Sequence, residues 1–448
     1  MKTAHKIIAL AVAMSFSCSG LLEEKPQLSL VVPTRLSEFR ALLDNTSQAM
    51  NLDPGLVELS ADDLTLDSAI LPRILIQEVN AYKWAEDIYE GENIGEWDTP
   101  FKAVHYANVV LDQLPLVPKA PQEEQAWKDL EGSALFYRAY AYWTLAKSFC
   151  LAYDDAADQT LGLPIRRSSV ITDKISRASL EETFAFILDD LNRSLELLGS
   201  NPSFRTRPSK EAAFALLAEV YLYMGDYEDA AGSAAKSLEI KADLMDYNKL
   251  STIAARPFVL FHPETVFYSS MVTYLYQVFD VVRVDPVLYA TYDEDDLRKE
   301  IYYVNKGSFV EFKGTYTGMT AFFSGLSVDQ VMLTQAECLA RLGREEEALA
   351  VLNELLSTRW KSGQFEELKA SPLKSVLDLI LEERRKSLVF RGVRWADLKR
   401  LNTDPRYAKD LTRTVDGTAY TLEAGSPKYA LPIPEQEINL TGIAPNPR

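Results

Sequence analysis

Histidine and cysteine are scarce in this chain of 448 residues, which contains three of each. His105 and His262 have no second histidine two or four residues away, a spacing that many zinc sites use, so we expect no metal and no cofactor of this kind. The chain also lacks the GxSxG, Walker and GxGxxG motifs. Their absence argues against the hydrolase and nucleotide-binding sites that these motifs build.

Basic residues are outnumbered by acidic ones. The chain has 47 lysines and arginines against 65 aspartates and glutamates, which gives a formal net charge of −18. Proteins that bind nucleic acid present a basic surface, so we expect no nucleic-acid partner. An acidic surface suits neutral ligands better than phosphates. Hydrophobic residues make up 47% of the chain, which is ample for a large core.

The N-terminal apolar run is too short to cross a bilayer. It covers residues 7–16 after two lysines, whereas a spanning helix needs about 20 residues. This pattern predicts an export signal at residues 1–17. The sequence SCSG at residues 17–20 resembles the lipobox of bacterial lipoproteins, so we expect an acylated Cys18 as lipid anchor, followed by a tether over residues 18–35. Ordinary signal cleavage with an unmodified Cys18 is the alternative.

The other two cysteines, Cys150 and Cys338, lie within apolar helical patterns. Because an exported protein meets oxidising conditions, they could form a disulfide. Free cysteine is among the most buried residue types, and this favours two buried free thiols instead.

Residues 207–240 have the pattern of a tetratricopeptide-like helical hairpin. Large and small residues recur at helical spacing on either side of Gly225, which separates the two helices. One hairpin cannot bury its own apolar face, so others must stack beside it. Residues 328–358 repeat the arrangement around Gly343, with Met332, Ala336, Leu339, Ala348, Leu352 and Leu355 at the positions of Phe214, Ala218, Tyr221, Ala230, Ala234 and Ser237.

Other segments can supply the neighbouring helices. Residues 123–149 and 179–198 are predicted to pair around an inserted loop, and Ser179 with Glu182 predicts a capping box at the start of the second helix. The proline-rich tail from Asn402 is expected to be irregular. Further expected elements are helices at 36–43, 101–114 and 372–390 and short strands at 266–271 and 303–312.

Taken together, these segments resemble the SusD/RagB family of outer-membrane nutrient-binding lipoproteins of Bacteroidetes-type bacteria. The most specific stretches are ILEERR at 380–385 and FRGVRWADLKR at 390–400. Ser387 and Arg391 depart from the family pattern, which usually has acids there, and the arginine usual near residues 327–329 is missing. Further matches are CSGLLEEKP at 18–26, RAYAY at 138–142, YDEDDLR at 292–298 and YALPIPEQEI at 429–438.

The resemblance implies an all-α fold with few short strands and a loop-rich ligand face. It implies a lipoprotein of the outer membrane that faces the exterior, binds oligosaccharide without catalysis and delivers it to a SusC-like TonB-dependent barrel transporter. Peptide binding, as in the RagB branch, is one alternative, and a glycosidase with two facing carboxylates is another. The single SusD-like domain would cover residues 36–448, with repeat-like hairpins at 123–198, 207–240, 328–358 and 372–401.

Aromatic residues beside acids and turn residues are the candidates for ligand binding. Rings in such loops can stack on a sugar while acids and amides bind its hydroxyl groups. Core packing is the alternative for these rings, and for Trp97 we favour packing on Phe101. The predicted ligand residues are Asp62, Asp63, Tyr82, Trp84, Trp97, Tyr274 and Tyr276.

Two charged runs have both a chemical and a structural interpretation. The sequence EERR at 382–385 contains paired carboxylates, but consecutive helix positions face different ways, so we expect ion pairs that hold this helix to its neighbours. The three aspartates within 293–296 resemble a calcium cluster, yet the glycine that a calcium loop needs is missing. We expect these acids to stabilise a helix N-terminus.

Overall fold

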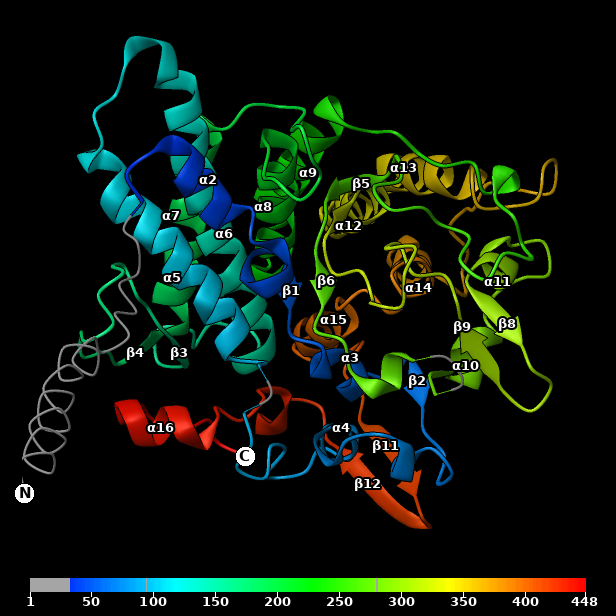
Figure 1. Ribbon diagram of the computed structural model, residues 1–448. Helices are drawn as coiled ribbons and strands as arrows, with labels where there is room; N and C mark the ends of the chain where they lie inside the picture. Colours follow the sequence, from blue (N-terminus) through cyan, green and yellow to red (C-terminus); the bar gives the residue numbers. More distant parts are fainter. Residues whose placement is uncertain (1–32, 94, 279–280) are drawn as a thin grey trace, which may run out of the picture.

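The computed structural model describes residues 33–93, 95–278 and 281–448. The predicted export signal, Cys18 and the tether up to residue 32 lie outside the described residues. Helices dominate the fold, which is all-α with short two-stranded sheets (Figure 1). Within the part that the structure describes, no helix combines the length and hydrophobicity needed to cross a bilayer.

Both central hairpins form as the repeat pattern predicts. Gly225 and Gly343 end the first helix of each with left-handed backbone angles, φ of 88° and 77°, which glycine adopts without a steric penalty. Helix α12 packs against α8 and α9 as well as α13, so the two hairpins stack. The four helices are α8 (Lys210–Met224), α9 (Tyr227–Ile240), α12 (Val328–Arg341) and α13 (Glu345–Ser357).

The remaining long helices extend this stack. Helices α5, α6 and α7 lie side by side next to α8 (Figure 1). The capping box is confirmed, because Ser179 Oγ accepts from the Glu182 N–H and the Glu182 carboxylate accepts from the Ser179 N–H. These helices are α2 (Leu36–Leu43), α5 (Asp98–Gln113), α6 (Glu124–Phe149), α7 (Leu180–Leu197), α14 (Val376–Ser387) and α15 (Arg394–Leu401).

Short strands and helices fill the opposite end of the molecule, at the lower right of Figure 1. Strand β2 (Leu64–Thr65) pairs antiparallel with β7 (Arg283–Val284). The segment 303–312 forms the expected hairpin of β8 (Tyr303–Asn305) and β9 (Val310–Phe312). Nearby short helices are α3 (Leu56–Ser60), α4 (Ile76–Tyr82), α10 (Pro286–Tyr289) and α11 (Arg298–Ile301).

Other strand pairs connect distant parts of the chain. The expected strand segment 266–271 divides into two short strands, each of which pairs with a different partner. The loop inserted between α6 and α7 carries its own antiparallel pair. The pairs are β1 (Leu52–Asp53) with β6 (Ser270–Met271), β5 (Thr265–Phe267) with β10 (Leu326–Ser327), and β3 (Leu161–Pro164) with β4 (Arg177–Ser179).

The C-terminal tail is more regular than the sequence predicted. Strands β11 (Leu411–Val415) and β12 (Thr418–Leu422) form an antiparallel hairpin around Asp416 and Gly417, and α16 (Glu435–Thr441) follows. The prolines that suggested an irregular chain all lie outside this hairpin, before it or after it, where they interrupt no ladder hydrogen bond. The expectation of an irregular tail was therefore wrong.

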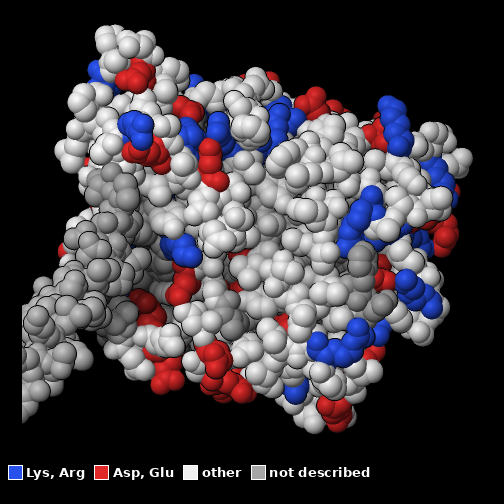
Figure 2. Space-filling model, in the orientation of Figure 1, with Lys and Arg blue, Asp and Glu red and all other residues white. Residues whose placement is uncertain are grey.

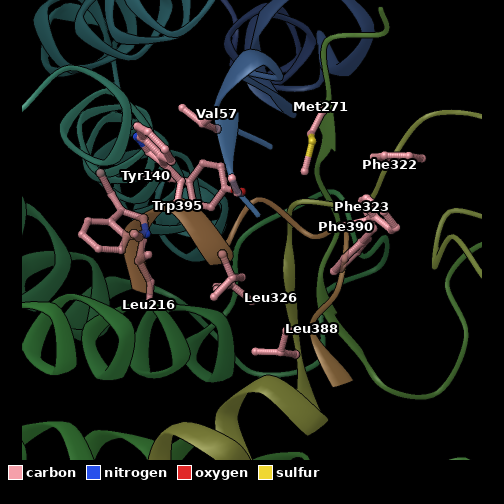
Figure 3. Close-up of a cluster of buried hydrophobic side chains, with 14 of the residues drawn as sticks. Val57, Tyr140, Leu216, Met271, Phe322, Phe323, Leu326, Leu388, Phe390 and Trp395 are labelled. Carbon is pink, nitrogen blue, oxygen red and sulfur yellow. The ribbon is translucent and has the colours of Figure 1, made fainter. Parts of the chain in front are cut away.

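One hydrophobic core joins the helices to the strand-rich end. Figure 3 shows Tyr140 and Leu216 from the helical stack facing Trp395 and Leu326, with Phe390 beyond them. All five are buried. Cys150 and Cys338 are also buried, and both are free thiols, as the sequence favoured.

The EERR run is confirmed as a set of ion pairs. Arg384 contacts Asp397 at 2.9 Å and Glu219 at 3.2 Å, which joins α14 to α15 and to α8. Glu383 contacts Arg298 at 2.6 Å, and Arg298 also pairs with Asp296. Asp296 is thus part of this buried network. Removing one partner of a buried pair leaves the other charge buried and uncompensated, so these contacts fix the position of α14.

Candidate functional site

The predicted rings Tyr82 and Trp84 are buried and hydrogen-bonded in the structure. Trp84 is 3% exposed, and its indole N–H donates to the Ser60 carbonyl at 3.0 Å. Tyr82 is also 3% exposed, and its hydroxyl accepts from the Leu66 N–H. The Arg413 guanidinium lies 4.0 Å from the Tyr82 ring and 4.4 Å from the Trp84 ring. These contacts match the core alternative that the sequence left open.

The second group of predicted rings is equally enclosed. Tyr274 donates its hydroxyl to Glu96 at 2.7 Å, and Tyr276 donates to the Gly55 carbonyl at 2.7 Å. Trp97 packs on Phe101 with 4.7 Å between ring centroids, which is the contact that the sequence favoured. Burial raises the pKa of Glu96 to about 7, although the Gly55 N–H and Tyr274 both donate to it.

Asp62 and Asp63 bind cations of the chain itself. Asp62 contacts Arg394 at 2.7 Å and Lys409, and Asp63 contacts Arg385 at 2.8 Å. Burial opposes the ionisation of Asp62, but these cations outweigh it and hold its pKa well below its usual range. The two aspartates therefore fasten the segment after α3 to α14 and α15.

The structure brings the predicted residues together around α3. Trp84 and Tyr276 donate to carbonyls within residues 55–60, and Glu96 accepts from two N–H groups of the same segment, which Asp62 and Asp63 follow directly. Most of the predicted ligand residues lie buried beneath the surface loops. Only three of them also line open hollows. Asp62 and Tyr82 line one hollow, and Trp97 lines another.

The first hollow consists of two neighbouring pockets beside the β2–β7 pair. We call the two pockets together the strand groove. It has two lobes, of about 300 Å³ and about 540 Å³, that share Thr65 and Leu66. The smaller lobe lies against β11, and the larger one lies between β7, α10 and the β8–β9 turn. The larger lobe is lined by Thr65, Leu66, Asp67, Arg283, Val284, Pro286, Tyr289, Asn305, Gly307, Ser308, Phe309 and Val310.

The larger lobe combines aromatic rings with polar groups. Tyr289 and Phe309 are half-buried, and Asn305 and Ser308 are exposed beside them. The Arg283 guanidinium carbon lies 3.7 Å from the Phe309 ring centroid, and Arg283 Nε lies 3.0 Å from an Asp67 oxygen. Sequence reasoning missed Asn305, Ser308 and Phe309 because it treated 303–312 only as strand, although Phe309 follows the turn signal Lys306-Gly307-Ser308.

The second hollow is larger and lies between α5, the inserted loop at 166–175 and α16. It has a volume of about 820 Å³. Val170, Ile171 and Leu440 line it and are exposed by 49%, 76% and 83%. Asn108 at its floor is saturated, since its amide donates to two carbonyls of the loop and accepts from Arg138. The cleft therefore exposes aliphatic side chains, but Phe101 and charged residues such as Lys102 and Glu437 line it as well.

Two models of one family match the chain. The model described as "Starch-binding associating with outer membrane" matches residues 21–222, and the model of the SusD family matches residues 330–445. The chain belongs to the SusD/RagB family. This SusD-like chain is 30% identical to SusD-like protein P2 of Formosa agariphila over 159 residues, which cover 35% of the chain but only 29% of that relative.

Solved structures have the same fold as this SusD-like chain. A SusD superfamily protein from Bacteroides thetaiotaomicron matches with a TM-score of 0.73 at 21% identity, covering 92% of this chain and 98% of that one. Surface glycan-binding protein A from Bacteroides fluxus matches with a TM-score of 0.70 at 18% identity, covering 93% and 100%. At these identities the likeness establishes the shared architecture.

Proposed function

We propose that this SusD-like protein binds oligosaccharides at the cell surface and delivers them to a TonB-dependent barrel transporter of the outer membrane. Family membership supports this proposal, as do the starch-binding description of one matching model and the glycan-binding name of a structural neighbour. Acylation of Cys18 would hold the protein on the membrane. The stacked repeat hairpins would face the barrel, because such hairpins are common scaffolds for protein contacts.

The carbohydrate would bind in the larger lobe of the strand groove. The observation that carries this placement is the presence of two half-buried rings, Tyr289 and Phe309, beside the exposed polar residues Asn305 and Ser308. A flat ring can pack on the C–H face of a sugar while amides and hydroxyls bind its hydroxyl groups. The α5–α16 cleft, which Phe101 and several charged residues line, is the alternative location.

Binding without catalysis fits the carboxylates of the strand groove. Asp62 is held by cations, Asp67 lies against Arg283, and Asp285 caps α10 by accepting from the Val287 and Leu288 N–H groups. A glycosidase needs one carboxyl group free to donate a proton and a second facing it across the sugar. The fourth carboxylate of the groove, Asp410, accepts from the Ala424 N–H. The engaged state of these four groups favours a binding protein.

Calorimetric titration with a panel of oligosaccharides tests the proposal. Phe309→Ala and Tyr289→Ala should each weaken binding roughly five- to 150-fold, because stacking of a flat ligand on an aromatic side chain contributes about 1–3 kcal/mol. Phe204→Ala is the matched control, since Phe204 is 55% exposed and does not line the groove. Equal affinities for wild type and both groove variants would refute the placement, and no binding by any oligosaccharide would refute the function.

A further inference from the structure

Arg283 lines the larger lobe. Its backbone pairs with Thr65 across the β2–β7 ladder, so the side chain starts from a rigid strand. Its guanidinium carbon lies 3.7 Å from the centroid of the Phe309 ring, and 15% of the side chain is exposed. A guanidinium stacked on an aromatic ring loses little further freedom when it binds an anion.

The hydrogen-bonding capacity of Arg283 is largely unused. Within the described residues, neither Nε nor Nη1 has a hydrogen-bond acceptor, although both atoms are buried. An Asp67 oxygen lies 3.0 Å from Nε, but the contact does not have the geometry of a hydrogen bond. Asp67 is also 55% exposed and already accepts from the Ala69 N–H. Buried donors without acceptors are costly, so a turn of the partly exposed guanidinium that brings these donors to an acceptor of the ligand would be stabilised.

We propose that the strand groove selects acidic oligosaccharides and that Arg283 binds the carboxylate of a uronic acid residue. The inference rests on the proposed function, because it names the class of sugar that the same groove would take. A planar guanidinium matches a carboxylate with two parallel N–H donors, which makes this pairing stronger and more directional than a contact with a neutral hydroxyl. Asn305 and Ser308 would then bind hydroxyl groups of the same sugar.

The acidic character of the whole chain does not oppose this local preference. Figure 2 shows many Lys and Arg side chains on the right of this face, over α10, β8 and β9, whereas Asp and Glu gather at the lower left around α16. Charges more than about 8 Å apart are largely screened at physiological ionic strength. A uronate in the groove would therefore interact mainly with Arg283 and its immediate neighbours.

The test compares two ligands that differ only in charge: an oligogalacturonate and the neutral oligosaccharide made by reducing its carboxyl groups. Calorimetric titration of the full exported chain should give roughly ten- to 150-fold tighter binding of the acidic ligand, since a hydrogen-bonded charge contributes about 1.5–3 kcal/mol. Arg283→Gln should abolish the preference and leave the neutral ligand unaffected. Arg193→Gln is the control, because Arg193 is 51% exposed on α7, away from the groove.

A second variant keeps the test decisive if Arg283→Gln fails to fold. Asp67→Asn removes the carboxylate that competes for Arg283 at an exposed position, so it should tighten binding of the oligogalacturonate without changing the thermal midpoint. Equal affinity for the acidic and neutral ligands in the wild type would overturn the inference while leaving the proposed function intact. Tighter binding of a sulfated oligosaccharide without carboxyl groups than of the uronate would overturn the assignment to a carboxylate.

Discussion

Arg391 and Asp329 form a buried ion pair in which two departures from the family pattern compensate each other. Arg391 Nη1 lies 3.0 Å from the Asp329 carboxylate and 3.1 Å from Ser327 Oγ. The family usually has an acid at position 391 and an arginine near residues 327–329. In this chain the two charges have exchanged places, so the contact between α12 and the turn before α15 is retained.

Exchanging these charges tests the compensation. Arg391→Glu alone should destabilise the protein by about 3–5 kcal/mol, because it leaves Asp329 buried beside a like charge. Adding Asp329→Arg should recover a large part of this loss. Urea denaturation of the two single variants and the double variant gives the coupling free energy. If the double variant lost as much stability as the two single variants together, the result would contradict the reciprocal pairing.

Trp84 provides a second test at the level of one residue. Because it is 3% exposed and bonded to Ser60, Trp84→Ala should lower the free energy of unfolding by about 3–5 kcal/mol. If Trp84 bound the ligand, as the sequence predicted, the substitution would instead reduce ligand affinity and leave stability almost unchanged. Thermal melting together with calorimetric titration of this variant separates the two roles. An unchanged melting temperature with lost affinity would return Trp84 to the binding site.

Helix α3 carries an ionisable group that links its stability to pH. Glu58 is fully buried, and one of its oxygens accepts from the Gly392 N–H. Burial, together with repulsion from Asp63, raises the pKa of Glu58 from its ordinary value of 4.5 to about 8. The folded state therefore holds a proton that the unfolded state has released, and stability falls as pH rises from about 4.5 towards 8.

Glu58→Gln should remove this pH dependence. The amide keeps an acceptor for the Gly392 N–H and never ionises, so the variant should gain stability relative to the wild type as pH rises and should differ least from it at pH 4.5. The measurement is the urea midpoint of both proteins between pH 4.5 and pH 9. Parallel pH profiles for the two proteins would show that Glu58 does not titrate in this range.

Helical elements could be predicted from sequence because their signals are local. The offsets around Gly225 and Gly343 and the capping box at Ser179 each lie within one hairpin or one turn. The β11–β12 hairpin was missed, although Leu411–Val415 alternates between buried and exposed side chains and Asp416-Gly417 is a turn signal. The prolines of the tail led to the prediction of an irregular chain despite this alternation of side chains.

The candidate site was harder to predict because its residues meet only in three dimensions. Arg413, which stacks on Tyr82 and Trp84, comes from the distant C-terminal hairpin, and the Glu96 partner of Tyr274 is equally remote in sequence. Aromatic residues beside acids have the same local pattern whether they face solvent or support a loop from beneath. Burial by such distant segments separated the two cases.

At the scale of the whole molecule, the lipid anchor predicted at Cys18 would determine where the protein works. Cys18→Ala should release the protein from the membrane fraction, because no acyl chain would then hold it. Intact-mass analysis of the native protein should give an acylated chain that starts at residue 18. A native protein with an unmodified cysteine and a soluble distribution would contradict the lipoprotein prediction and favour ordinary signal cleavage.

Hydrogen exchange measured with and without a bound oligosaccharide tests the central claim most directly, since it reports both binding and its place on the molecule. Slower amide exchange is predicted at β2, β7, α10 and the β8–β9 hairpin, which surround the larger lobe of the strand groove. Exchange in α5 and in the inserted loop at 166–175 should stay unchanged. Protection confined to α5, this loop and α16 would contradict the account by moving the carbohydrate site to the α5–α16 cleft.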